Sequence, residues 1–393
     1  NAVVKPGLFG SLVGSIKNIT FADCTIDSGK DKTGVGLIAG YAKNATIENV
    51  TVTGLTINSS GYKTDGQHIG GLVGMAEDCV FKNNNIEINI PDIDADEQTP
   101  SVAGGMIGVL KGNNNTVENC HTKGTIYGQV IGDALGLGTE FMNDDEMAQK
   151  YPNGITHYGD IFQDRHRSRW KPGAWTDDTD MMLCIADAII KDKSVNLISI
   201  AQNFKDWACG IPMGIGRHTF NILHIGDYVE KPFDVSKLIW EMSGKRIASN
   251  GGLMRTSVVG LLSTNVEKNA ADICRLTHYD PRCVASCVIV SRLIHSLVYT
   301  SSPLTYVQIK DIACRYDERI DSFIELSKNN NIRTLALQDE DTMGYTLKTL
   351  AAGLWAYWHA NTFEEGLLSV VRAGGDADTN AAVACAILGA KFG

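Results

Sequence analysis

Four similar phrases follow one another in the first 125 residues, and a repeat of this kind restricts the folds available to the chain. They read GSLVGSIKNITFADCTI, GLIAGYAKNATIENVTV, GGLVGMAEDCVFKNNNIEI and GGMIGVLKGNNNTVENCHT. The closing glycines Gly14, Gly40, Gly74 and Gly108 are separated by 26, 34 and 34 residues. Each phrase joins a short apolar strand bounded by glycine to an alternating strand rich in Thr, Val, Ile and Asn. A unit this small cannot bury its own apolar face, so the repeat predicts a β-solenoid over residues 1–125.

These phrases resemble the GLUG repeats of many bacterial surface and secreted proteins. Their asparagine runs, KNNNIEI and KGNNNTVEN, are expected to form ladders or turn caps along the stack. No acid pair, histidine cluster or nucleophile stands out in this third of the chain. We therefore interpret it as a scaffold or interaction module, with a protein as its possible partner.

Past Tyr127 the apolar residues recur at helical spacing, for example in MMLCIADAII, RCVASCVIVSRLIHSLVYT and LKTLAAGLWAYWHA. This period predicts a second, all-α domain over residues 126–393. No Pro/Ser-rich linker separates the two parts, which indicates a rigid junction near residues 124–130.

Composition excludes some functions and locations. The formal net charge of −10 argues against a nucleic-acid binder, which would need a basic surface. No apolar run approaches the roughly 20 residues of a membrane span, and no signal peptide opens the chain, although a targeting segment could have preceded Asn1. The scattered cysteines, such as Cys184, Cys274 and Cys385, are interpreted as reduced core thiols. Reduced thiols favour a cytoplasmic location, whereas the GLUG-like repeats leave a secreted or cell-surface location open.

The segment WTDDTDMMLCIADAII, residues 175–190, puts three acids directly before an apolar helical pattern. Asp177, Asp178 and Asp180 repel one another at neutral pH unless a proton or a cation neutralises them. Helix capping explains part of this charge, with Thr176 or Asp177 as N-cap. The alternative is a divalent cation such as Mg²⁺, held by Thr176, Asp177 and Asp178. Taken alone, the segment favours capping.

A second cluster, AGGDADTNAAVACAILGAKFG, closes the chain. It places Asp376, Asp378 and Thr379 where a loop runs into an apolar helix, and Gly374 and Gly375 allow close backbone approach. If both clusters meet in one pocket, their oxygen atoms fit two metal ions about 3.5–4 Å apart, bridged by Asp178 or Asp378. The mirrored pair therefore favours metal binding over capping.

Six motifs, in order, resemble the ADP-ribosylglycohydrolases, which include the dinitrogenase reductase-activating glycohydrolases and the ADP-ribosylarginine and ADP-ribosylserine hydrolases. They are GDALGLGTEF (132–141), WTDDTDMM (175–182), GIGRHT (214–219), SNGGLMR (249–255), LTHYDP (276–281) and GGDADTNAAV (374–383). The resemblance covers residues 126–393. Ser249 stands where the family usually has glycine, and Gly214 replaces a common acidic residue. These two differences concern the substrate end of the pocket and leave the metal ligands unchanged.

The resemblance implies an all-α domain whose pocket holds two Mg²⁺ ions, with Mn²⁺ as an alternative. The implied ligands are Thr176, Asp177, Asp178, Asp376, Asp378 and Thr379, and the implied catalytic residues are Glu140 and Asp178. Metal contact is the other role that the resemblance implies for Glu140, which without the resemblance would be interpreted as a solvated loop residue. Contacts with the substrate are implied for Gly216, Ser249, Asn250, Gly251, Gly252, Met254 and His278. For His278, a core histidine satisfied by a neighbour is an equal alternative. The basic run DRHRSRW (164–170) is either a solvated face or a guide for a diphosphate or an acidic partner.

The predicted activity is magnesium-dependent hydrolysis of the C1″ glycosidic bond between ADP-ribose and an acceptor. The favoured substrate is ADP-ribosylated protein, with arginine the favoured linkage; serine-linked protein and small ADP-ribose conjugates stay open. Two other classes also remain. One is a catalytically inactive module that binds ADP-ribose or a protein. The other is a metal-dependent phosphohydrolase, which would release phosphate or AMP instead of ADP-ribose.

Overall fold

The computed structural model describes residues 7–27, 34–58, 68–89, 102–104, 107–111, 116–118, 121–122, 124–210, 212–300 and 302–392. The chain divides into two compact units. The first extends to Lys123 and takes in the last two residues of the chain, and the second runs from Gly124 to Lys391.

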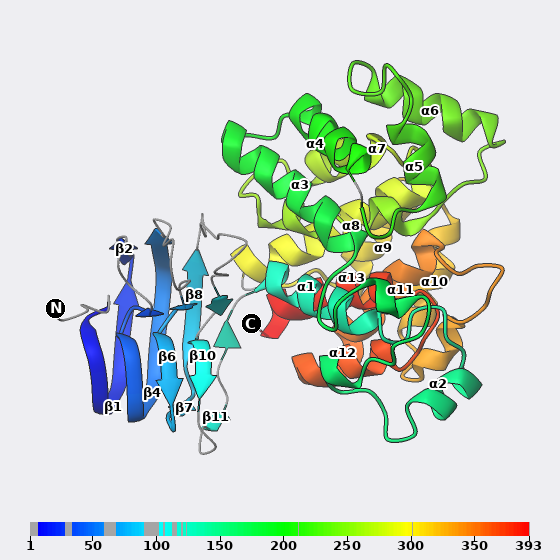
Figure 1. Ribbon diagram of the computed structural model, residues 1–393. Coiled ribbons are helices and arrows are strands. Elements are labelled where there is room, and N and C mark those ends of the chain that lie inside the picture. Colours follow the sequence, from blue (N-terminus) through cyan, green and yellow to red (C-terminus); the bar gives the residue numbers. More distant parts are fainter. Residues whose placement is uncertain are drawn as a thin grey trace. The chain divides into compact units, whose positions relative to one another are not determined.

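The first unit is built from strands, which stand side by side in Figure 1. They are β1 (Phe9–Ala22), β2 (Thr25–Asp27), β3 (Gly34–Val35), β4 (Ala39–Asn58), β5 (His68–Gly70), β6 (Val73–Glu77), β7 (Val80–Lys82), β8 (Asn85–Asn89), β9 (Val102–Gly104), β10 (Ile107–Lys111), β11 (Thr116–Glu118) and β12 (His121–Thr122). One sheet has the order β10-β6-β4-β7-β11, with β1, β2, β8 and β12 joined to it, and a second has the order β3-β5-β9.

The strand register follows the sequence repeat. Every pairing among the described strands of this unit is parallel. Ala39 of β4 lies opposite Val73 of β6, and Val73 lies opposite Ile107 of β10. Equivalent apolar residues of successive phrases therefore lie side by side, and β3 to β8 bury a continuous core that includes Ile38, Ile47 and Phe81.

Asparagines form a ladder where the strands turn. The Asn49 side-chain amide donates to Asn18 Oδ1 (2.8 Å), and that of Asn83 donates to Asn49 Oδ1 (3.1 Å). All three have φ between 52° and 56°, a left-handed conformation that asparagine tolerates better than most residues. The ladder expected for KNNNIEI is confirmed, whereas Asn113, Asn114 and Asn115 of KGNNNTVEN lie outside the described residues.

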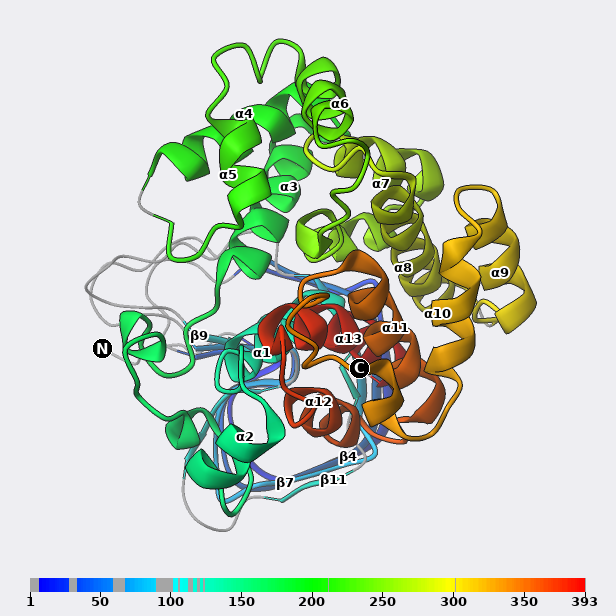
Figure 2. The same cartoon turned by 90° about the vertical axis from the view of Figure 1, so that its right-hand side faces the viewer.

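The second unit is helical, as Figure 2 shows from a second side. Its α-helices are α1 (Thr125–Gly136), α2 (Asp144–Lys150), α3 (Asp177–Asp192), α4 (Leu197–Cys209), α5 (Arg217–Leu223), α6 (Pro232–Met242), α7 (Val266–Arg275), α8 (Pro281–Tyr299), α9 (Tyr306–Cys314), α10 (Arg319–Ser327), α11 (Thr346–His359), α12 (Phe363–Val371) and α13 (Ala377–Phe392). The predicted helical character of this part of the chain is confirmed.

Helix α8 lies in the core of this unit. Among the described residues it is the one helix long and apolar enough to cross a membrane, and 72% of its apolar window is buried within the fold. Burial of this extent is typical of a core helix in a globular protein. Cys274 and Cys385 are buried and Cys184 is half-buried, as expected for core thiols, whereas Cys209 and Cys314 are exposed and do not fit that interpretation.

Helix α1 approaches α13 so closely that only glycine fits at the contact. A Cβ on Gly132 would lie 2.2 Å from the carbonyl oxygen of Ala381, and Gly128 and Gly136 make the same kind of approach. This contact brings the C-terminal end of α1 to the N-terminal end of α13.

Replacing Gly132 with alanine should force the two helices apart. We expect Gly132→Ala to lower the free energy of unfolding by about 1–3 kcal/mol, as overpacking of cores does. The measurement is urea denaturation followed by tryptophan fluorescence, because all six tryptophans lie in the helical unit. Gly226→Ala is the matched control, since no atom lies within 4 Å of a Cβ there, and it should change stability by less than about 0.5 kcal/mol. Equal stability of the two variants would contradict the packing argument.

Candidate active site

The first acidic cluster lies at the N-terminus of α3, where a buried aspartate from α1 holds it. Thr176 is the N-cap of α3, one of the two capping choices. The Asp133 carboxylate accepts hydrogen bonds from the backbone N–H and Oγ1 of Thr176, and from the same two groups of Thr179, at 2.6–3.1 Å. Burial raises the pKa of Asp133 to about 6, although these hydrogen bonds favour its ionised form.

The three aspartates of this cluster have different surroundings. Asp180 points away from the other two and accepts hydrogen bonds from the indole N–H groups of Trp175 (2.8 Å) and Trp207 (3.1 Å). Asp177 and Asp178 instead line a cavity of about 510 Å³. Capping and indole binding therefore explain Thr176 and Asp180, but they leave two carboxylates unexplained.

The second cluster meets the first in this cavity. Thr379 Oγ1 donates to Asp178 Oδ2 across 3.3 Å, and Thr176 Oγ1 lies 3.3 Å from the same oxygen. Asp376, Asp378 and Thr379 line the cavity together with the residues of the first cluster. Two segments far apart in the sequence thus contribute side-chain oxygens to one site.

Glycines before α13 bring a third segment to the site. Gly374 and Gly375 have φ of +66° and +70°, and a Cβ on Gly375 would lie 2.1 Å from the Leu337 carbonyl oxygen. The Phe141 N–H donates to the Gly375 carbonyl (2.6 Å), and the Gly375 N–H donates to the Met142 carbonyl (3.1 Å). This pair of backbone hydrogen bonds ties the loop after α1 to the residue before Asp376.

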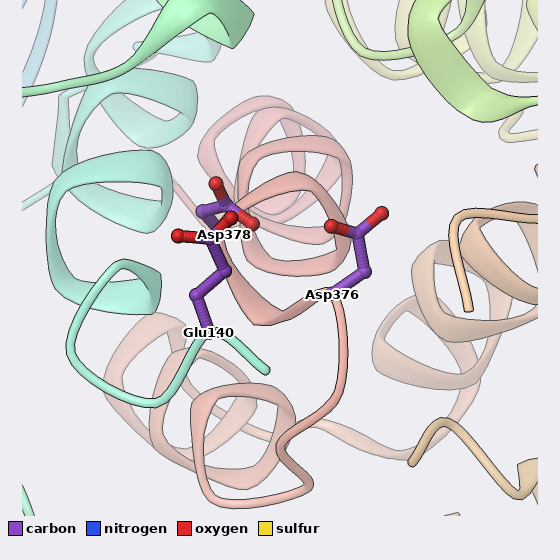
Figure 3. A group of neighbouring side chains, drawn as sticks. All are labelled: Glu140, Asp376 and Asp378. Atoms are coloured by element: carbon purple, nitrogen blue, oxygen red, sulfur yellow. The ribbon is translucent and has the colours of Figure 1, made fainter. Parts of the chain in front are cut away.

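The tied loop carries Glu140, which is 8% exposed and lies beside Asp376 and Asp378. One carboxylate oxygen from each of these three residues lies within 4.8 Å of the others. Figure 3 shows Glu140 reaching from its loop toward Asp378, while both aspartates extend from the start of α13. A glutamate that would be solvated in an isolated loop is here buried among acids.

The electrostatics of these carboxylates are unfavourable without a cation. Burial raises the pKa of Asp177 to about 7 and that of Asp376 to about 6, and nearby carboxylates add to both shifts. Burial and the neighbouring acids also raise the pKa values of Asp178 and Asp378 well above the usual range. Within the described parts of the chain, no lysine or arginine forms a salt bridge with any of these four aspartates.

The chemistry of the donor set fits a divalent cation. Asp178 Oδ1 and Asp378 Oδ1 are buried and have no hydrogen-bond partner in the described structure. A buried carboxylate oxygen without a partner costs free energy that a bound cation would remove. The surrounding atoms are carboxylate and hydroxyl oxygens, which Mg²⁺ prefers.

The segment Ser249–Gly252 forms another part of the cavity. Ser249, Asn250 and Gly251 line the cavity, as do Gly216 and Met254. The Asn250 amide donates to Asp376 Oδ2 (2.6 Å) and to Thr349 Oγ1 (2.9 Å), so it orients a carboxylate of the second cluster.

His278 and Gly252 do not line the cavity and lie behind this segment. The Ser249 hydroxyl contacts His278 Nε2 (3.0 Å), and the Thr277 hydroxyl contacts Nδ1 (2.8 Å). A Cβ on Gly251 would lie 3.0 Å from His278 Cε1, and one on Gly252 would lie 3.1 Å from Cβ of the same histidine. Close packing against His278 therefore explains why glycine occupies positions 251 and 252. His278 itself is a core histidine that is hydrogen-bonded to its neighbours.

Several cavity residues lie in segments quoted in the sequence analysis but were not assigned individual roles there. Phe141, His166, Arg169, Trp170, Arg217, His218 and Thr219 also line it. Asp133, which bonds Thr176, is a further residue of the site that the sequence analysis missed. One signal could have identified Asp133: it lies in the motif GDALGLGTEF, one helical turn before the loop that carries Glu140. The run DRHRSRW is not merely a solvated face, because Arg167 is 3% exposed and His166 contacts Glu140.

Comparison with known proteins agrees with this geometry. A family model described as ADP-ribosylglycohydrolase matches residues 113–393, and one described as the GLUG motif matches residues 32–58. The chain is 27% identical to an ADP-ribosyl-[dinitrogen reductase] glycohydrolase of Rhodospirillum rubrum, over 69% of this chain and 85% of that protein. It is 26% identical to the ADP-ribosylarginine hydrolase Tri1 of Serratia proteamaculans, over 69% of this chain and 71% of that protein.

A solved structure named ADP-ribosylglycohydrolase-related protein complex is 22% identical, with a TM-score of 0.49, over 69% of this chain and 87% of that chain. The assignment rests on the sequence matches, which confirm the resemblance found in the six motifs. Since the first family model spans more than half of the chain, the protein belongs to the ADP-ribosylglycohydrolase family and is a glycosidic-bond hydrolase.

Proposed function

We propose that this protein hydrolyses the C1″ glycosidic bond between ADP-ribose and an acceptor, releases ADP-ribose, and requires Mg²⁺. The acceptor that we favour is an arginine side chain of ADP-ribosylated protein. The names of two similar proteins support this choice, since one refers to ADP-ribosylarginine and the other to an ADP-ribosylated reductase. Serine-linked protein and small ADP-ribose conjugates are the alternatives that an assay separates.

One observation carries the proposal: the buried carboxylates of two distant clusters meet in one cavity with partnerless oxygens. The cavity volume, about 510 Å³, lies in the range of small-molecule sites. The family supplies the substrate class. The cavity is lined by acidic side chains and also by the cationic Arg169 and Arg217.

The ligands that we assign to two Mg²⁺ ions, with Mn²⁺ as an alternative, are Thr176, Asp177, Asp178, Asp376, Asp378 and Thr379. When bound, such ions supply Lewis acidity and hold substrate oxygens in place. Glu140 is proposed to accept a proton from the water that attacks C1″, with Asp178 as the other candidate for that role. The departing acceptor atom takes up a proton as its bond to C1″ breaks, so the products are ADP-ribose and the unmodified acceptor.

Contacts with ADP-ribose are assigned to the predicted residues that line the cavity, namely Gly216, Ser249, Asn250, Gly251 and Met254. Gly252 and His278 are assigned a supporting role behind them.

For the first unit we propose a β-solenoid of GLUG-like repeats over residues 1–125, joined to a catalytic domain over residues 126–393. The parallel pairing and its 34-residue offset between Ala39, Val73 and Ile107 support stacked repeats. No group of metal-binding side chains is found among its described residues, and we propose that this unit binds a protein partner.

Removing one proposed ligand should abolish turnover. We expect Mg²⁺-dependent release of ADP-ribose from arginine-linked substrate, and a loss of more than about 100-fold in kcat/KM for Asp378→Asn. The measurement is chromatographic detection of ADP-ribose from arginine-, serine- and ester-linked substrates, with Mg²⁺ or with EDTA. Asp187→Asn, on the exposed face of α3, is the charge-matched control and should stay within about twofold of the original protein.

The products of this assay distinguish the proposed activity from the two alternative functions. Release of phosphate or AMP would indicate a phosphohydrolase. Binding of ADP-ribose without release of product from any substrate would indicate a non-catalytic module, and the proposal would then be wrong.

Metal binding should also change the pH dependence of stability. The pKa values of Asp177 and Asp376 are raised from 3.8, so between that value and about 7 the folded protein binds more protons than the unfolded chain. Rising pH therefore destabilises the metal-free protein across this window. Because Mg²⁺ binds the ionised carboxylates, it should raise the melting temperature more at about pH 8 than at about pH 5.

Differential scanning fluorimetry with Mg²⁺ and with EDTA measures this difference. In an Asp178→Asn/Asp378→Asn double variant the gain from Mg²⁺ should disappear. A gain of equal size in that variant would show that Mg²⁺ binds elsewhere.

A further inference from the structure

We propose that His166 is a positioning residue for Glu140, and that its Nε2–H holds the Glu140 carboxylate beside Asp376 and Asp378. The inference rests on the proposed function, in which Glu140 handles a proton. It gives a role to His166 of the run DRHRSRW, which the proposed chemistry does not otherwise use.

The contact between the two side chains is short and sheltered. His166 Nε2 lies 2.6 Å from Glu140 Oε2, and Glu140 is 8% exposed. Among the residues that the structure describes, no other group donates a hydrogen bond to the Glu140 carboxylate. The neighbouring acids Asp376 and Asp378 repel this carboxylate, so a single donor on its other side determines where it rests.

Arg169 fixes the direction of this hydrogen bond. Its Nη2 lies 2.8 Å from His166 Nδ1, and a guanidinium can only donate. Nδ1 of the imidazole is therefore an acceptor, which leaves the ring hydrogen on Nε2, where it faces Glu140. Arg169 Nη2 thus donates to His166 Nδ1, and His166 Nε2 donates to the Glu140 carboxylate.

Aromatic side chains hold the imidazole ring in place. The ring centroids of Phe141 and Trp170 each lie 5.4 Å from that of His166. The Arg169 guanidinium in turn lies over Trp170, 4.4 Å from the ring centroid. The imidazole is therefore oriented by packing as well as by hydrogen bonds.

The backbone of the Glu140 loop is held separately, by Arg167. Its Nε donates to the carbonyl oxygens of Leu137 (3.0 Å) and Gly138 (2.9 Å), and its Nη2 donates to the Glu140 carbonyl. Asp164 pairs with Arg167 Nη1 at 2.5 Å. Because Arg167 holds the backbone and His166 the carboxylate, changing His166 should move the Glu140 side chain without moving its loop.

Two variants of His166 separate the hydrogen bond from the packing. His166→Phe keeps a ring between Phe141 and Trp170 but removes the donor, whereas His166→Gln keeps an N–H donor but removes the ring. We expect His166→Phe to lower kcat by about 10–100-fold, as loss of an orienting partner does, with KM within about threefold. His166→Gln should recover kcat to within about fivefold of the original protein.

The structural readout is independent of turnover. In a crystal structure of His166→Phe, the Glu140 carboxylate should turn away from Asp376 and Asp378 while the Arg167 contacts to the loop carbonyls persist. An unmoved carboxylate would overturn the proposal, as would an unchanged kcat in His166→Phe or an equal loss in both variants. If the original protein released no ADP-ribose, the proposed function would fail, and the crystal structures would still decide whether His166 positions Glu140.

Discussion

The structure of the helical unit depends on the burial of several carboxylates at one point. Such burial is unfavourable unless each acid is held in place and the charge is neutralised. Asp133 ties the start of α3 through Thr176 and Thr179, and backbone hydrogen bonds tie the Glu140 loop to Gly375. These ties bring α1, α3 and α13 together at their ends, and the close glycine contacts between α1 and α13 make that arrangement possible.

Acids that look equivalent in the sequence have different functions in the fold. Within WTDDTDMM, Asp177 and Asp178 face the cavity, whereas Asp180 holds two indole rings. Helical spacing does not explain the difference, because residues three apart, such as Asp177 and Asp180, are neighbours on a helix surface. It follows from the partners of each side chain, which for Asp180 are the indole groups of Trp175 and Trp207. Charge density alone therefore identifies a site but does not assign its members.

The two units illustrate two ways in which sequence controls structure. In the first, a repeat places like residues side by side, so local patterns such as the asparagine ladder propagate along the strands. In the second, no repeat exists, and the site is made by contacts between residues more than 200 positions apart, such as Thr379 with Asp178. Each motif alone was weak evidence for a site, but the fold brings the two acidic motifs together in one cavity.

The sequence by itself determined the β and helical character of the two parts and the position of two acidic clusters, because strand and helix periods and clustered acids are local patterns. It also led to the family, through six ordered motifs. Only the tertiary structure decided that Asp133 anchors α3, that Glu140 is buried among acids, and that His278 lies behind the cavity. It also gave His166 its place beside Glu140. Burial and hydrogen bonding between distant segments depend on how helices pack, and no spacing along one chain specifies those distances.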